Sequence, residues 1–132
     1  MALFRHLRTL LTVSEATDEA QTGKTYAVLP SDGDSVGDHQ QSWRAFIDIS
    51  QSGGDTSPTT DCALQTSHDG DSWITAASAT QLTGDGEGHE MKELAALGPF
   101  VRAVTTLGGG SNPSHTVTVK LASTGPFSTQ AK

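Results

Sequence analysis

Hydrophobic and polar residues alternate along several short stretches of the chain, and this period of two indicates β-strands. In residues 43–50 one face carries Trp43, Ala45, Ile47 and Ile49, and the other carries Arg44, Asp48 and Ser50. Phe46 interrupts the polar face, so we expect another element or a partner to cover it. Residues 116–121 alternate in the same way, with Val117, Val119 and Leu121 predicted to point inward.

A tight turn between two β-forming runs predicts a hairpin. Residues 61–67 and 72–76 flank the sequence His68-Asp69-Gly70-Asp71, and Trp73 follows the turn. An Asp-Gly turn in this setting is a strong short-range hairpin signal. Cys62 and Leu64 are the expected inward residues of the first strand.

Turn signals recur along the rest of the chain at the spacing of an antiparallel sandwich. Further strands are expected at 25–29, which Pro30 ends, and at 100–106. Loops are expected at 14–24, 31–38 and 83–89, a hairpin loop at 107–113, and either a short strand or a helical turn at 91–97. The predicted fold is therefore all-β, an antiparallel β-sandwich of jelly-roll or Ig-like type.

The two ends differ from the body, so we divide the chain into residues 1–13, a sandwich domain at 14–124 and a C-terminal tail at 125–132. The first segment is apolar and basic, and its leucines fit either a helix or a strand. It is either an arm that docks on a neighbouring subunit or the first strand of the domain. Arg5 and Arg8 interrupt its apolar run, so we interpret it as mature sequence rather than a targeting peptide.

Composition limits the class of partner. The chain has 132 residues, a formal net charge of −7 and only 8 Lys and Arg residues, which argues against binding nucleic acid. A partner with basic patches is more consistent with this charge. No apolar run approaches the ~18 residues of a membrane span, so we expect a soluble protein.

Candidate catalytic and metal motifs are weak. Gly23-Lys24-Thr25 lacks the upstream glycine of a phosphate-binding loop. The acidic turns 32–38 and 69–71 supply oxygen ligands for calcium, but neither has helix-loop-helix spacing, and we interpret them as surface turns. The histidines show no paired spacing and are interpreted as solvated loop residues: His6, His39, His68, His89 and His115. We therefore expect no enzyme, with no catalytic, cofactor-binding or metal-binding residues.

Single residues with possible chemistry have structural interpretations. Cys62 lies in a strand pattern and is expected to pack as a small buried residue. Trp43, Trp73 and Tyr26 would suit a sugar-stacking platform, although core packing is the expected use of both tryptophans. A carbohydrate-binding adhesion module is the alternative of a different class.

One family resemblance extends over residues 43–122. It rests on Leu64 to Trp73 with the Asp-Gly turn, on Leu97-Gly98-Pro99-Phe100-Val101-Arg102-Ala103, and on Gly108-Gly109-Gly110 before a Thr/Val strand. This pattern resembles small β-sandwich structural proteins of tailed bacteriophages. The resemblance implies a non-enzymatic virion component, a minor capsid or decoration protein that stabilises the capsid, with a head-to-tail connector or tail component as the nearest variant.

These considerations define the expected partners. The expected partners are the major capsid protein or other virion proteins. The chain itself is expected to be a homo-oligomer or to be present in many copies on the particle. It is expected to reside in the virion, which is assembled in the host cytoplasm. The apolar residues of the end segments and of the polar strand face are the predicted partner-binding set: Leu3, Phe4, Leu7, Phe46 and Phe127.

Overall fold

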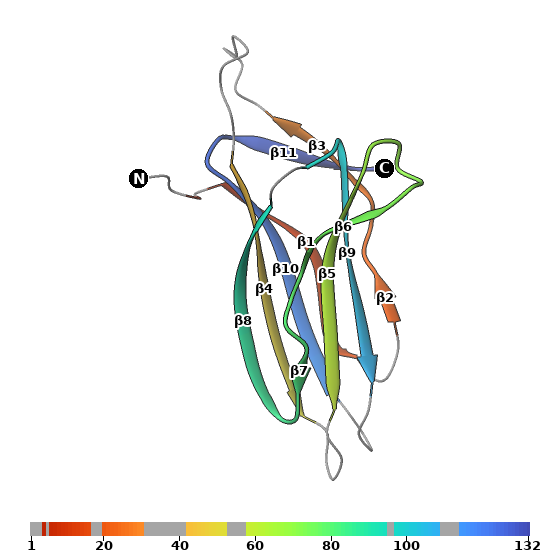
Figure 1. The fold of residues 1–132 in the computed structure, drawn as a ribbon, viewed down its shortest axis with the longest axis vertical. Helices are drawn as coiled ribbons and strands as arrows, with labels where there is room; N and C mark the ends of the chain where they lie inside the picture. Colours follow the sequence, from red (N-terminus) through yellow and green to blue (C-terminus); the bar gives the residue numbers. More distant parts are fainter. Residues whose placement is uncertain are drawn as a thin grey trace.

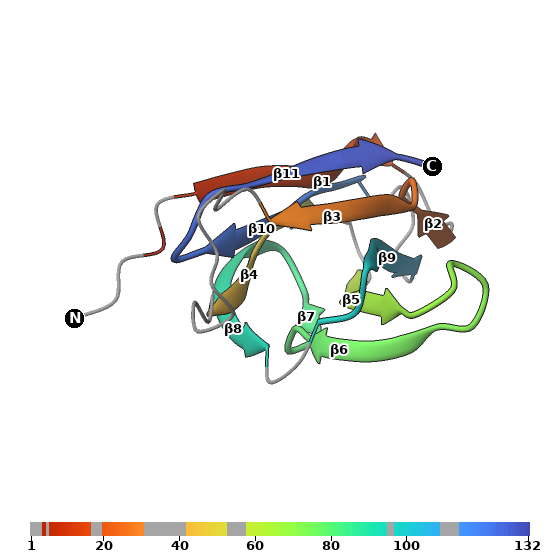
Figure 2. The same ribbon diagram turned by 90° about the horizontal axis from the view of Figure 1, so that it is seen from above.

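The computed structural model describes residues 4, 6–16, 20–30, 42–52, 58–94, 97–108 and 114–132. Within these ranges the chain forms strands and no helix, and the strands make two sheets that face each other (Figures 1 and 2). The strands are β1 (His6–Ala16), β2 (Ala20–Thr22), β3 (Tyr26–Pro30), β4 (Trp43–Ser52), β5 (Thr59–Ser67), β6 (Ile74–Ser78), β7 (Leu82–Thr83), β8 (Gly86–Leu94), β9 (Phe100–Gly108), β10 (Ser114–Ser123) and β11 (Phe127–Ala131).

The strand order is that of a jelly roll. Sheet A has the order β1-β10-β4-β8, and sheet B has the order β11-β3-β9-β5-β6, with β2 on β9 and β7 on β5. All pairings are antiparallel, and β1 with β10, β3 with β9, β4 with β8 and β5 with β6 form a nested series. A long hairpin wound around itself produces this series. The predicted antiparallel β-sandwich is confirmed, and its topology is the jelly roll rather than the Ig-like arrangement.

The core lies between the sheets and consists of the predicted inward residues. The register of β4 and β10 pairs Ala45 with Leu121, Ile47 with Val119 and Ile49 with Val117. These six side chains are buried, as are Cys62 and Leu64 on the facing strand β5. Burying a large aliphatic side chain contributes roughly 1.5–3 kcal/mol, so these layers dominate the stability of the fold.

Two segments that were expected to be loops contain strands. The glycine-rich stretch 83–89 was expected to be a loop, but β8 begins at Gly86 and pairs with β4 along its whole length. Likewise β1 extends to Ala16 and β2 lies within the expected loop at 14–24. Cross-strand pairing with a regular neighbour overrides the weak strand preference of glycine and polar residues. The expected acidic loop at 31–38 lies outside the described residues.

The expected hairpin between 100–106 and 116–121 is also absent, because β9 belongs to sheet B and β10 to sheet A. β9 pairs with β2, β3 and β5, whereas β10 pairs with β1 and β4. Alternation of apolar residues identifies the buried face of a strand but does not identify its neighbour.

Both ends of the chain take part in the sandwich. The segment from His6 is the edge strand β1, which agrees with the first-strand interpretation of the N-terminus. The C-terminal tail expected at 125–132 is instead the strand β11, paired with β3, and the backbone N–H of Lys132 donates to the carbonyl of Thr25 at 2.9 Å. The strand β11 was missed because a single aromatic residue among polar residues gives no periodic signal.

Phe127 closes one end of the core. Its side chain is 3% exposed, and its ring meets the ring of Trp43 edge to face, with centroids 4.9 Å apart and an interplanar angle of 72°. Edge-to-face pairs of this kind add stability beyond the area that they bury. Phe127 is therefore a core residue in this structure rather than an exposed partner-binding residue.

We expect Phe127→Ala to reduce the free energy of unfolding by about 3–5 kcal/mol, because it leaves a cavity beside Trp43. Urea unfolding followed by tryptophan fluorescence measures this change. Ser128→Ala, at an exposed position of the same strand, is the matched control and should change stability by less than ~0.5 kcal/mol. Equal stability of the two variants would contradict the placement of β11.

Candidate interaction surface

The outer face of sheet A carries its side chains in rows that cross all four strands. Neighbouring residues in each row are cross-strand partners, so their Cβ atoms lie about 4.5–5.5 Å apart. From β1 to β8 the first row is Leu7, Ala122, Arg44 and Glu93, the second is Thr9, Lys120, Phe46 and Met91, and the third is Thr12, Thr118, Asp48 and His89.

Apolar side chains gather in the first two rows. Leu7 is 42% exposed, Met91 is 47% exposed, and Phe46 between them is half-buried. We call Phe4, Leu7, Phe46 and Met91 the apolar band. Apolar side chains that gather on one exposed face of a sheet, rather than scattering singly, are typical of an interaction surface.

Arg44 lies within the apolar band. Its guanidinium carbon is 4.3 Å from the ring centroid of Phe4, and its Nη1 lies 3.5 Å from the sulfur of Met91. Its Nε is buried and has no hydrogen-bond acceptor among the described residues. Ala122, the row neighbour of Arg44, is fully buried although its strand position faces outward. The guanidinium is thus partly removed from water and makes no ion pair with a described carboxylate.

Other charges on this face are arranged across β4 and β8. The imidazole Nδ1 of His89 lies 2.7 Å from Oδ1 of Asp48, and this hydrogen bond raises the pKa of His89 above its ordinary value. Glu93, the cross-strand neighbour of Arg44, is exposed and makes no ion pair with the described residues. This face therefore offers both a cation and a carboxylate to a partner.

The predicted partner-binding residues separate into two groups. Phe4, Leu7 and Phe46 come together on the outer face of sheet A, whereas Phe127 points inward and Leu3 lies outside the described residues. Sequence reasoning missed Met91 and Arg44. The pairing of Met91 with Phe46 was the signal, but it appears only once β8 is recognised as a strand.

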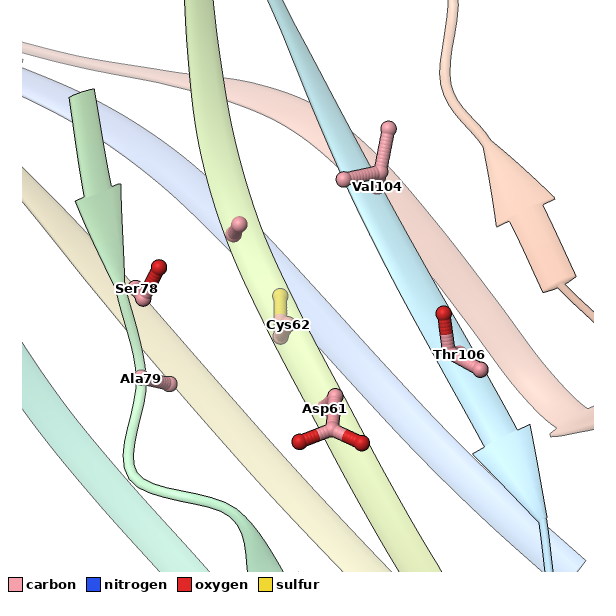
Figure 3. Close-up of a pocket in the computed structure, with 7 residues that line it drawn as sticks. Asp61, Cys62, Ser78, Ala79, Val104 and Thr106 are labelled. Carbon is pink, nitrogen blue, oxygen red and sulfur yellow. The ribbon is translucent and has the colours of Figure 1, made fainter. Parts of the chain in front are cut away.

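A hollow lies on the outer face of sheet B. It has a volume of about 160 Å³, and Figure 3 shows Asp61, Ser78 and Thr106 around it. The carboxylate of Asp61 accepts hydrogen bonds from the Gln81 amide at 2.9 and 3.1 Å. Cys62 is buried as predicted, and burial raises the pKa of its thiol to about 12, which disfavours the nucleophilic thiolate.

A cleft of about 320 Å³ opens between β8 and the segment that leads into β7. Its apolar floor includes Ile47, Ile49 and Leu82. At its rim the carboxylate of Glu90 accepts hydrogen bonds from the backbone N–H and the hydroxyl of Thr80, at 2.7 and 2.9 Å. These contacts connect the edges of the two sheets.

His115 is buried in β10, so its interpretation as a solvated loop histidine is wrong. The Gln51 amide donates to the carbonyls of Leu82 and Gly84, and its Oε1 accepts from the hydroxyl of Thr60 at 2.6 Å. Because Thr60 gives its only proton to Gln51, its oxygen accepts from His115 Nδ1 at 2.6 Å. This buried network fixes β4, β5 and β10 at one end of the sandwich.

The acidic turn and the tryptophans have structural uses. Asp69 Oδ1 accepts hydrogen bonds from the backbone N–H groups of Ser72 and Asp71, and these bonds hold the pKa of Asp69 below its usual range. Trp43 packs against the core, as predicted, whereas the guanidinium of Arg102 lies 4.2 Å from the ring centroid of Trp73. The expected core role of Trp73 is thus replaced by a contact with Arg102.

Across the described ranges no three His, Cys, Asp or Glu side chains are grouped to hold a metal ion, and no helix is long and apolar enough to cross a membrane. Comparison of the chain with protein families, with curated proteins and with solved structures finds no match. The fold and the surface define a jelly-roll β-sandwich with an exposed apolar band on sheet A.

We expect Thr60→Val to lower the free energy of unfolding by about 1–3 kcal/mol, because the buried Oε1 of Gln51 loses its donor while the volume of the side chain is kept. Thermal or urea unfolding measures the loss. Thr118→Val, at a position facing outward on β10, serves as the control and should have little effect. Comparable losses in both variants would argue against the network.

His89 should titrate above 6.5 in an NMR pH titration, and Asp48→Asn should return its pKa toward that value. Because the folded-state pKa is raised, the pair stabilises the fold below about pH 6.5, and this contribution disappears as the pH rises through the folded-state pKa. Identical titration curves in the two proteins would contradict the hydrogen bond.

Proposed function

We propose that this chain is a non-enzymatic structural protein of a tailed-bacteriophage virion, which decorates and stabilises the capsid. The observation that carries the proposal is the apolar band on the outer face of sheet A. Phe46, the one apolar interruption of the polar face of its strand, lies there beside the exposed Met91. This is a surface suited to protein contacts, while the resemblance of residues 43–122 supplies the virion setting.

The distribution of charge supports a partner with basic patches. Four of the 8 Lys and Arg residues lie over aromatic rings of this chain: Arg8 over Phe127, Arg44 over Phe4, Arg102 over Trp73 and Lys132 over Phe100. The acidic residues Asp71, Asp85 and Glu87 are exposed at turns and at the start of β8. These four cations are thus in contact with aromatic rings of the chain, whereas the three carboxylates are exposed to the solvent.

The use of reactive and aromatic residues favours a structural role over the alternatives. The thiol of Cys62 is buried with a pKa of about 12, and Asp69 is engaged in its own turn. The ring of Trp43 meets Phe127, and Arg102 lies over the ring of Trp73, which leaves less aromatic surface for stacking on a sugar. A multicopy protein also needs only weak contacts per copy, since multivalency strengthens attachment.

The purified protein should cosediment with undecorated phage heads in a saturable way and remain unbound to isolated tails. Binding should weaken as salt is raised, because exposed carboxylates contribute to the contact. Binding confined to the neck or tail would replace the decoration role with a connector or tail role. Binding to none of these particles, with binding to a glycan array instead, would overturn the virion proposal.

A further inference from the structure

The outer faces of β4 and β8 are self-complementary. Their cross-strand pairs are Arg44 with Glu93, Phe46 with Met91 and Asp48 with His89. Each pair joins a cation to a carboxylate, an apolar side chain to another, or a carboxylate to a histidine. Consider a two-fold axis that lies between two facing copies, runs parallel to the strands and passes over the line midway between β4 and β8. Such an axis would place β4 of one copy opposite β8 of the other. The same three pairs would then meet between the copies.

Neither Arg44 nor Glu93, the two charged residues of the first row, makes an ion pair with the described residues. Arg44 contacts Phe4 and Met91 and makes no ion pair with a described carboxylate, although Glu93 is its neighbour on the sheet. A carboxylate from outside the chain would compensate the partly desolvated guanidinium. Because Glu93 is exposed, a second copy related by this axis would place its own Glu93 carboxylate in the same row as Arg44.

The second row supplies the apolar contact of such an interface. Phe46 is half-buried and Met91 is 47% exposed, so both retain surface that a facing sheet would bury. Sheets that pack face to face lie about 10 Å apart, with their strands rotated by roughly 30°. Phenylalanine and methionine side chains are long enough to fill that separation.

Edge-to-edge pairing is the competing arrangement, and its charge balance depends on the register of the two copies of β8. If two copies of β8 paired antiparallel about Glu90, each Glu87 would face the Glu93 of the partner. Like charges directly opposite each other on paired strands are destabilising. In that register the edge is disfavoured, whereas face-to-face packing of β4 and β8 places unlike charges opposite each other.

We propose that the partner of the apolar band is a second copy of this chain, packed through the outer faces of β4 and β8 with Arg44 against Glu93 in both directions. This inference rests on the proposed structural role, since it uses the same face for protein contact. Its test contains no phage component, so the failure of either proposal is recognised separately.

Sedimentation equilibrium of the full chain over a concentration series should show a reversible monomer–dimer equilibrium. Met91→Glu should raise the dimer dissociation constant at least tenfold, because it places a charge in the apolar contact. Ile74→Glu is the matched control: Ile74 is 68% exposed, lies on sheet B and undergoes the same substitution. Circular dichroism and urea unfolding establish that both variants are folded.

A charge exchange tests the orientation of the dimer. Glu93→Arg should weaken dimerisation, and so should Arg44→Glu, whereas the double variant Arg44→Glu/Glu93→Arg should recover affinity toward the wild-type value. Recovery shows that the two residues are coupled, because two independent effects would add. Since Arg44 and Glu93 are also neighbours within one chain, equal unfolding free energies of the single and double variants are needed to assign the coupling to the interface.

A wild-type chain that remains monomeric over the whole concentration series would overturn the proposal. A dimer that Ile74→Glu weakens as much as Met91→Glu would overturn it as well, since the interface would then not be specific to sheet A. A double variant weaker than either single variant would overturn the pairing of Arg44 with Glu93.

Discussion

The register between β10 and β4 is the constraint on which both the core and the surface depend. The two strands pair over ten residues without a shift, from Ser114 with Ser52 to Ser123 with Trp43. On the inner side this register layers Val119 against Ile47, and on the outer side it aligns Lys120 with Phe46. A slip of one residue would turn the polar side chains inward and break every row on the outer face. Core packing therefore fixes the geometry of the apolar band.

The sequence predicts those parts of the fold in which one strand carries its own signal. Alternation identified the buried faces of β4 and β10, and the Asp-Gly turn identified the β5–β6 hairpin. The first part of β8, residues 86–90, was missed because glycine and charged residues dominate it, and its stability comes from pairing with β4. A strand at 91–97 was one of two expected alternatives, and β8 continues to Leu94. The strand β11 was missed because its contribution is a single ring, that of Phe127, which contacts a residue far away in sequence.

The candidate surface was predictable only in part, for a related reason. Phe46 breaks the polar face of its strand, and that local irregularity marked it as a contact residue. Arg44 and Met91 became relevant only through cross-strand pairing, which a period of two does not specify. His115 was expected to be a solvated loop residue but is buried. Its hydrogen-bond network involves Thr60 and Gln51, which lie on two other strands, so its own sequence neighbourhood gave no indication of burial.

The edges of the sheets explain why a face is the more suitable surface for assembly. An open strand edge invites uncontrolled pairing, and proteins prevent it with charges, irregularities and short strands. Here β1 contains register shifts, β8 carries three glutamates, and β7 has two residues. Addition of strands at these edges is therefore disfavoured, while the outer face of sheet A keeps exposed apolar side chains between charges of both signs. Protected edges at β1 and β8, together with apolar side chains exposed on the outer face of sheet A, favour contact through that face over strand addition, as the proposed multicopy structural role would require.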